Sequence, residues 1–298
     1  MTTTAATTQT PCRHPRRRAA VIAAIIALGL AACGGEATPT ATTVTATAPH
    51  LQRPSAPVDA LIDIDGGRMH LRCIGDGATT ALLIAGWGDG GDNWGAIEPP
   101  IAERARVCSY ARFGTGTSDP PATTQTFDTH AADLHALLQR AGEPGPYVLL
   151  GHSFGGAEAV TFASKYPQEV TGLMLLDASP PTWPATVCTV PEYAAGCAVM
   201  RDPVLDPERL DVFPAFDAVA GISSLGDLPM TVVTAAHRID PGLGRAELRR
   251  LDTVWAEGVE RWAALSSSSN VVSVEDTGHD IELDQPDLVV EELPRLLP

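Results

Sequence analysis

The sequence has few basic residues, no hydrophobic run as long as a transmembrane helix and none of the common metal-binding spacings. Only 20 of its 298 residues are Lys or Arg, against 36 Asp or Glu, so the formal net charge is −16. Because nucleic-acid binding depends on clustered basic side chains that replace counterions, this composition argues against a nucleic-acid partner. No Cys-x-x-Cys motif or paired histidine spacing is present, so we expect no metal site. Hydrophobic residues make up 44 % of the chain, which is typical of a folded globular protein.

One apolar run lies near the N-terminus and is shorter than a transmembrane helix. It covers residues 19–30, whereas a spanning helix needs about 20 residues. Four arginines precede it, at positions 13, 16, 17 and 18, and small residues follow. This order predicts a secretory signal peptide over residues 1–32.

The end of this segment, Leu30-Ala31-Ala32-Cys33-Gly34-Gly35, resembles the lipobox of bacterial lipoproteins. The resemblance implies cleavage before Cys33 and lipidation of its thiol. The protein would then be exported and held on the outer face of the bacterial membrane. The alternative is an ordinary signal with a chance cysteine, and therefore a secreted protein. Residues 33–57 are rich in Thr, Ala and Pro and show no apolar periodicity, so we expect a flexible tether.

Four further cysteines belong to the expected folded domain, residues 58–298. Cys73 and Cys108 fall in predicted strands, and Cys188 and Cys197 lie close together in a proline-rich segment. Cysteines of an exported protein meet an oxidising compartment. We therefore predict the disulfides Cys73–Cys108 and Cys188–Cys197.

From residue 60 onward, short apolar runs alternate with helical patterns. The predicted strands cover residues 60–64, 69–73, 81–85, 106–110, 147–150, 173–176, 231–234 and 271–274, and apolar helical faces occur in 128–141 and 245–265. Continuous apolar strands are buried on both faces, as in parallel sheets. The pattern predicts an α/β fold with a doubly wound, mainly parallel, eight-stranded sheet. Residues 180–228 interrupt the alternation with many prolines, and we interpret them as a small lid insertion over the carboxyl edge of the sheet.

The clearest motif is Gly151-His152-Ser153-Phe154-Gly155, between a predicted strand and a predicted helix. A Gly-x-Ser-x-Gly sequence in this context forms a sharp turn that projects the serine hydroxyl above the sheet. The helix N-terminus at this point favours developing negative charge. We therefore predict Ser153 to be a nucleophile.

A serine nucleophile needs a general base, and the sequence offers eight histidines. His152 lies within the turn, whose geometry directs it away from the serine hydroxyl. His279 follows the last predicted strand by five residues. The base comes last in the chain order that accompanies this serine motif, so we predict His279 to be the base.

Two further motifs add to these. Residues 110–119, Tyr-Ala-Arg-Phe-Gly-Thr-Gly-Thr-Ser-Asp, resemble the Tyr-Asp-Arg-x-Gly-x-Gly-x-Ser-Asp segment of the α/β-hydrolase superfamily. Gly278-His279 followed by residues 283–286, Leu-Asp-Gln-Pro, resembles its C-terminal histidine motif. Two positions depart from the family: Ala111 replaces the usual aspartate, and Ala85-Gly86 replaces a usual His-Gly. The resemblance covers residues 58–298 apart from the lid and implies a Ser-His-Asp triad.

The acid of that triad has two candidates. Asp177 ends the sixth predicted strand, and Asp240 follows the seventh. The superfamily most often places the acid about four residues after strand seven, which here is Arg238, whereas some members use the end of strand six. We favour Asp177, with Asp240 as the alternative.

An acyl-transfer site also needs backbone N–H groups for the oxyanion. One is that of Phe154, directly after the nucleophile, and the resemblance implies Trp87 as the other. The same loop matches Gly-x-Gly-x-x-Gly at Gly86, Gly88 and Gly91, a dinucleotide fingerprint. No immediate helix is expected after it, and no acidic residue stands about 20 residues on, so we expect no cofactor.

The sequence as a whole predicts an exported serine hydrolase that cleaves small-molecule carboxylic esters through an acyl-enzyme. Two alternatives stay open. A peptidase or amidase of the proline-iminopeptidase kind would need carboxylates in the lid, for which Glu192 and Asp202 are candidates. A binding protein could keep the fold without catalysis.

Overall fold

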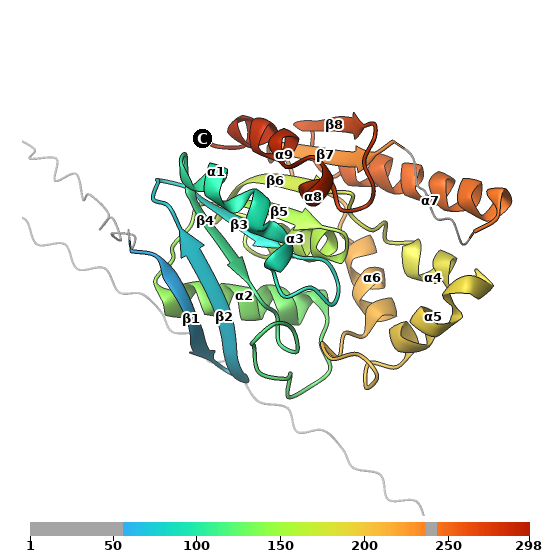
Figure 1. The fold of residues 1–298 in the computed structure, drawn as a ribbon, viewed down its shortest axis with the longest axis horizontal. Coiled ribbons are helices and arrows are strands. Elements are labelled where there is room, and N and C mark those ends of the chain that lie inside the picture. Colours follow the sequence, from blue (N-terminus) through green and yellow to red (C-terminus); the bar gives the residue numbers. More distant parts are fainter. Residues whose placement is uncertain (1–55, 237–242) are drawn as a thin grey trace, which may run out of the picture. The chain divides into compact units, whose positions relative to one another are not determined.

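In the computed structural model, which describes residues 56–236 and 243–298, one eight-stranded sheet organises the chain (Figure 1). The strands are β1 (Val58–Ile64), β2 (Gly67–Ile74), β3 (Thr80–Ile84), β4 (Arg106–Tyr110), β5 (Tyr147–His152), β6 (Val170–Leu176), β7 (Met230–Ala235) and β8 (Ser269–Val274). Their spatial order is β1-β2-β4-β3-β5-β6-β7-β8. The two pairings of β2 are antiparallel, and those from β4 to β8 are parallel. The predicted α/β class and the eight predicted strands are confirmed.

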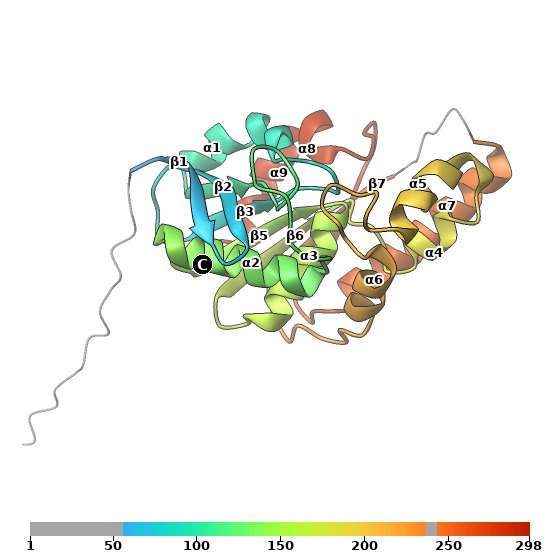
Figure 2. The same cartoon turned by 90° about the horizontal axis from the view of Figure 1, so that it is seen from below.

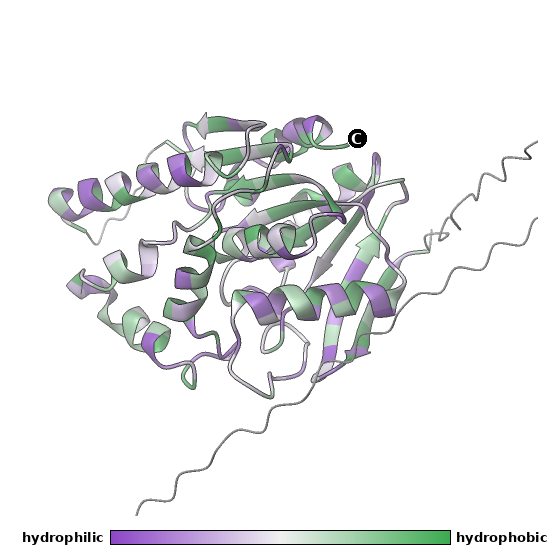
Figure 3. Ribbon diagram, turned by 180° about the vertical axis from the view of Figure 1, so that it is seen from behind, coloured by the Kyte–Doolittle hydropathy of each residue, from purple (hydrophilic) through white to green (hydrophobic). Residues whose placement is uncertain are grey.

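Helices cover both faces of this sheet. They are α1 (Glu98–Ala102), α2 (Phe127–Ala141), α3 (Phe154–Lys165), α4 (Trp183–Val187), α5 (Ala194–Arg201), α6 (Val212–Ala220), α7 (Arg245–Ala263), α8 (Ile281–Asp284) and α9 (Pro286–Glu292), with 3-10 turns η1 (Asp92–Ala96), η2 (Pro191–Tyr193) and η3 (Leu293–Arg295). Alternate residues of a strand point to opposite faces. Leu82 and Ile84 accordingly join a core with α2, α3 and α6, whereas Ala81 and Leu83 join a second core with α1, α9 and η3. Figure 3 shows the apolar residues concentrated along the strands.

One detail differs from the expectation. A helix does follow the glycine-rich loop directly, because η1 begins at Asp92 with Gly91 as its N-cap, and α1 begins soon afterwards. Proline is tolerated in the first turn of a helix, where its missing N–H has no intrahelical partner, so Pro99 fits the start of α1.

The insertion between β6 and β7 contains α4, η2, α5 and α6. The helix α4 contacts α6 and α7, and α5 contacts α6 (Figure 2). The helical periodicity of this segment is weak because its helices are short and proline-rich, which is why the sequence did not resolve them.

Both predicted disulfides are present. Cys73 and Cys108 are cross-strand partners on β2 and β4, and Cys188 and Cys197 join the end of α4 to α5. Cys33 lies outside the described residues, as do the expected signal peptide and all of the expected tether except residues 56 and 57. Within residues 56–236 and 243–298, no helix has the length and apolar character needed to cross a membrane.

Candidate active site

Ser153 occupies the sharp turn between β5 and α3. Its backbone has φ 53° and ψ −122°, a conformation that L-residues rarely adopt. The turn is possible because its glycines lack side chains: a Cβ atom on Gly155 would lie 2.2 Å from the carbonyl oxygen of Ile84, and one on Gly151 would lie 2.5 Å from that of Gly155. The turn exposes the serine hydroxyl at the carboxyl edge of the parallel strands.

The structure brings Ser153, His279 and Asp177 together at this edge. Ser153 Oγ lies 2.9 Å from Nε2 of His279, and Nδ1 of the same ring lies 2.7 Å from Oδ2 of Asp177. With Nδ1–H donating to the carboxylate, Nε2 can accept from the serine hydroxyl. The carboxylate of Asp177 is fully buried, whereas the His279 side chain is 38 % exposed.

Asp177 is held by more groups than the sequence indicated. Its Oδ1 accepts hydrogen bonds from Nε1 of Trp255 at 2.8 Å, from Oγ1 of Thr234 at 3.2 Å and from the backbone N–H of Ala235 at 3.3 Å. The backbone of Asp177 itself has a φ of 39°. Neither Trp255 nor Thr234 carried a sequence signal beyond its place in an apolar helix or strand, because their contact with Asp177 is formed only by the tertiary fold. Asp240, the alternative acid, lies outside the described residues.

The two residues expected to supply oxyanion N–H groups lie side by side. The rings of Trp87 and Phe154 stack with centroids 5.3 Å apart and planes 6° apart. The loop that carries Trp87 adjoins the nucleophile, since a Cβ atom on Gly86 would lie 3.4 Å from Cβ of Ser153. Both residues therefore belong to segments that adjoin Ser153.

His152 supports the backbone of His279 and does not contact the serine hydroxyl. Its Nε2–H donates to the carbonyl oxygen of His279 at 3.1 Å. Burial, with a smaller contribution from the neighbouring His279, lowers the pKa of His152 to about 3, so this ring stays neutral. On its other side, Nδ1 lies 3.2 Å from Oε1 of Glu282. Burial, helped by Asp280 and Asp89, raises the pKa of the Glu282 carboxyl to about 8.

Among residues 56–236 and 243–298, two groups of side chains have the spacing needed to ligate a metal ion. One group contains the two cysteines of the Cys73–Cys108 disulfide with Glu143, so its sulfur atoms are already bonded. The other contains His152, Asp280 and Glu282. These three could offer one nitrogen and two carboxylate ligands, and His152 hydrogen-bonds the backbone carbonyl of His279 and not the serine hydroxyl.

A cavity of about 870 Å³ opens above Ser153 and His279. Much of its lining is apolar and aromatic, and comes from the insertion and from α7: Trp183, Tyr193, Met200, Leu251 and Trp255. Glu192 and Asp202, the candidate carboxylates for a peptidase, are exposed and do not line the cavity.

Comparison with known proteins gives the family. The family model described as alpha/beta hydrolase fold matches residues 81–240, more than half of the chain. The chain is 23 % identical over 237 residues to the uncharacterized protein YqjL of Bacillus subtilis, covering 79 % of this chain and 90 % of that protein. It is 28 % identical over 191 residues to Lipase 3 of Moraxella sp., covering 64 % of this chain and 58 % of the lipase.

A solved structure has the same fold. The thermophilic esterase from Thermogutta terrifontis aligns with a TM-score of 0.57 at 22 % identity, over 80 % of this chain and 97 % of that one. The fold, the sharp serine turn and the matched family model agree, and the chain belongs to the alpha/beta hydrolase fold family.

Proposed function

We propose that this protein is a serine hydrolase that cleaves carboxylic esters through a covalent acyl-enzyme. The observation that carries the proposal is the continuous series Ser153–His279–Asp177, with contacts of 2.9 and 2.7 Å, at the floor of a large cavity. The names of relatives such as Lipase 3 of Moraxella sp. add support for ester chemistry.

The reaction follows from the direction of the hydrogen bonds along Ser153, His279 and Asp177. Ser153 Oγ attacks the ester carbonyl carbon while its proton passes to Nε2 of His279, and Asp177 stabilises the imidazolium. The oxyanion of the tetrahedral intermediate accepts hydrogen bonds from the N–H groups of Trp87 and Phe154. The C–O bond then breaks, and His279 returns its proton to the leaving alcohol. Water repeats these steps on the acyl-enzyme and releases the carboxylic acid.

The cavity favours an ester with an apolar substituent. Trp183 and Met200 from the insertion and Leu251 from α7 present apolar surface to the cavity. An acyl or alcohol group placed there gains from removal of its surface from water. Glu192 and Asp202 are exposed and do not line the cavity, so the two lid carboxylates that an aminopeptidase would use are not placed to bind a substrate ammonium.

The experiment is hydrolysis of a series of p-nitrophenyl esters with acyl chains of two to twelve carbons. The wild type should turn over the series, and S153A should fall to the background rate because it lacks the hydroxyl that hydrogen-bonds Nε2 of His279. Turnover of these esters by S153A at the wild-type rate would refute the proposal.

We also propose export and lipid anchoring at Cys33. The support is the lipobox-like sequence before Cys33, together with two disulfides, which form and persist in oxidising compartments. Growth of a bacterial host with an alkyne-tagged fatty acid should label the wild type in the membrane fraction. C33A should lose the label, and retention of the label in C33A would exclude this site.

A further inference from the structure

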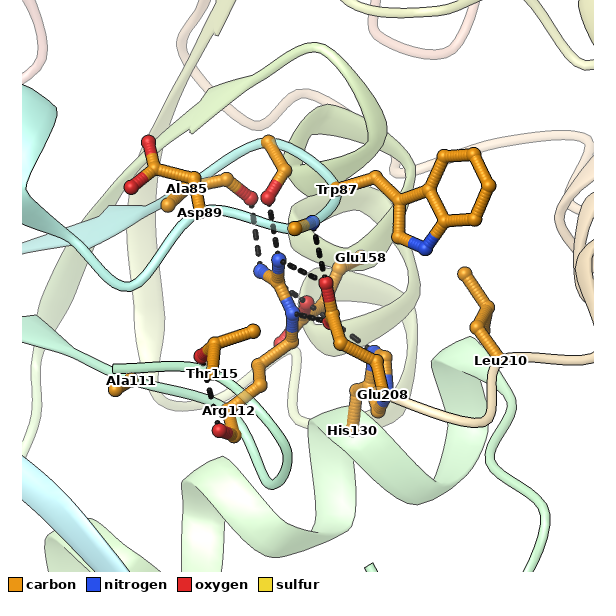
Figure 4. A network of polar contacts seen from close by, with 12 residues as sticks. Ala85, Trp87, Asp89, Ala111, Arg112, Thr115, His130, Glu158, Glu208 and Leu210 are labelled. Carbon is orange, nitrogen blue, oxygen red and sulfur yellow. Dashed lines mark hydrogen bonds and ion pairs between the residues drawn. The ribbon is translucent and has the colours of Figure 1, made fainter. Parts of the chain in front are cut away.

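A second set of buried charged side chains lies beside the cavity, and the proposed reaction does not use it. Arg112, Glu158, Glu208 and Asp206 are each at most 4 % exposed (Figure 4). Arg112 belongs to the loop after β4, Glu158 to α3, and Asp206 and Glu208 to the insertion. Buried charges are unfavourable unless they are paired and hydrogen-bonded, so the contacts of this cluster indicate what it holds in place.

Arg112 is bonded to the backbone that leads into the oxyanion loop. Its Nη1 donates to the carbonyl oxygen of Ala85 at 2.8 Å, and its Nη2 donates to that of Gly86 at 2.5 Å. Burial acts to lower the pKa of Arg112, but Glu208 and Glu158 outweigh it and raise that pKa above its usual value. The guanidinium is therefore charged at every working pH.

These contacts fix the direction of the N–H group of Trp87. The Gly86 carbonyl and the Trp87 N–H belong to one planar trans peptide unit, so they point in opposite directions. Holding the Gly86 oxygen on Arg112 therefore aims the Trp87 N–H away from the guanidinium. The same hydrogen bond draws electron density towards the oxygen and makes that N–H a stronger donor.

The insertion holds the same loop from a second direction. Glu208 Oε1 accepts from the Gly88 N–H at 2.5 Å, and its Oε2 accepts from Nε of Arg112 at 2.5 Å. Asp206 Oδ2 accepts from Nε1 of Trp87 at 3.0 Å. Figure 4 shows Arg112 and Glu208 meeting under the loop that carries Trp87.

The segment that supplies these carboxylates is itself anchored. Asp206 also accepts from the backbone N–H groups of Glu208 and Leu210, at 3.2 and 2.9 Å. Backbone hydrogen bonds of 2.9 Å join Gln125 to Arg209 and to Asp211. Glu208 is thus presented by a segment of the insertion that is held by several backbone hydrogen bonds.

We propose that Glu208 and Arg112 are positioning residues that orient the Trp87 N–H for the oxyanion, so that the insertion completes the oxyanion hole. This inference rests on the proposed esterase function and goes beyond it, because it gives the insertion a role in rate as well as in substrate choice. An oxyanion donor acts on the transition state far more than on the bound ester. Disturbing it should therefore lower kcat and leave KM nearly unchanged.

The test compares E208Q with a matched variant, E143Q. Glu143 forms an equally buried pair with Arg106, with contacts of 2.7 and 2.5 Å, and does not line the cavity. Both variants replace a buried carboxylate partner of an arginine by an amide, so both should lose stability. Only E208Q should lower kcat for p-nitrophenyl butyrate, by about 10- to 100-fold with KM within about 2-fold, since removal of a whole oxyanion donor costs about 10²–10³ in kcat.

A trifluoromethyl ketone with the same acyl chain gives a second measurement, because its serine adduct carries the oxyanion. Its inhibition constant should rise in E208Q by about the same factor as kcat falls, and should stay at the wild-type value in E143Q. If E208Q does not fold, E208D retains the charge but shortens the reach, and it is judged by the same two measurements.

An unchanged kcat in folded E208Q or E208D, or an equal loss in E143Q, would overturn the inference. So would a rise in KM at constant kcat. Failure of the proposed function gives a different result: the wild type would not hydrolyse the ester, or S153A would hydrolyse it equally well.

Discussion

The half of the cavity built on the sheet differs in kind from the half built by the insertion and α7. On the sheet side, Ser153, Asp177 and His279 follow the carboxyl ends of three parallel strands and are joined by hydrogen bonds. On the other side, residues such as Trp183 and Met200 present mainly apolar surface. The difference teaches that the proposed reacting groups are positioned by backbone turns at the edge of the sheet, while the shape of the cavity depends on the helices packed over it.

This comparison predicts that the largest losses come from the sheet half. D177N keeps the shape of the side chain but removes the charge that orients and stabilises His279. We expect kcat to fall by about 10⁴, the size seen when a triad aspartate becomes asparagine. Steady-state kinetics of ester hydrolysis by the purified proteins would measure this fall in kcat. D240N is the control and should retain the wild-type kcat. A large loss of kcat in D240N with none in D177N would identify Asp240 as the acidic member of the triad.

Trp255 links the two halves, because it lines the cavity and donates to Asp177. W255F removes that donor and keeps an aromatic ring, while Thr234 and Ala235 still donate to the carboxylate. We expect kcat to fall about 10-fold and the free energy of unfolding to fall by about 1.5–3 kcal/mol, the range for a hydrogen bond to a charged group. Enzyme kinetics and urea unfolding would check both values.

The matched control is W262F on the same helix. Trp262 is also buried, but its Nε1 donates to the carbonyl oxygen of Ala178 and not to the acid. W262F should lose stability with little change in kcat. Equal kinetic losses in the two variants would mean that Trp255 acts only through the packing of α7.

The apolar side chains of the insertion that line the cavity should change substrate choice more than rate. W183A enlarges the cavity at the point where the ring of Trp183 packs edge-on against that of Trp255, with the ring centroids 5.0 Å apart. We expect the ratio of kcat/KM for octanoyl over butyryl esters to change about 10-fold, the low end of the range for one methylene in an apolar pocket. V204A, an exposed change in the same insertion, serves as the control. A uniform loss across all chain lengths in W183A would contradict this division of roles.

The last expected effect concerns stability and not the rate of reaction, and it comes from a carboxyl group beside His152. The pKa of Glu282 is raised to about 8 in the folded protein, chiefly by burial, while its unfolded value is about 4.3. The folded state then holds the proton more tightly, so this contribution to stability is full below about pH 4 and is lost as the pH rises to about 8. E282Q removes it.

The groups that face Glu282 are His152, Asp280, Asp89 and Asp177, and all four are present in both proteins. The difference in free energy of unfolding, E282Q minus wild type, should therefore rise between pH 5 and pH 8. Urea unfolding at both values measures it, and a difference that does not change with pH would show that Glu282 does not titrate in this range.

Much of the fold and part of the site could be predicted from the sequence, for physical reasons. Continuous apolar runs marked the buried parallel strands, and the glycines around Ser153 marked a turn that excludes side chains. The contacts of Asp177 with Trp255 and of Glu208 with Gly88 could not be predicted, because the partners are 78 and 120 residues apart and meet only in the tertiary fold. The helices of the insertion were missed because each is too short to establish a period.

The most direct test of the central claim is the site at which a fluorophosphonate becomes attached. Ser179 Oγ lies only 3.3 Å from Ser153 Oγ, so inhibition alone does not identify the nucleophile. Peptide mapping by mass spectrometry after labelling of the full chain would do so. The account predicts one adduct per chain, on Ser153, which is absent in S153A and retained in S179A. An adduct on Ser179, or no adduct on an enzyme that hydrolyses esters, would contradict it.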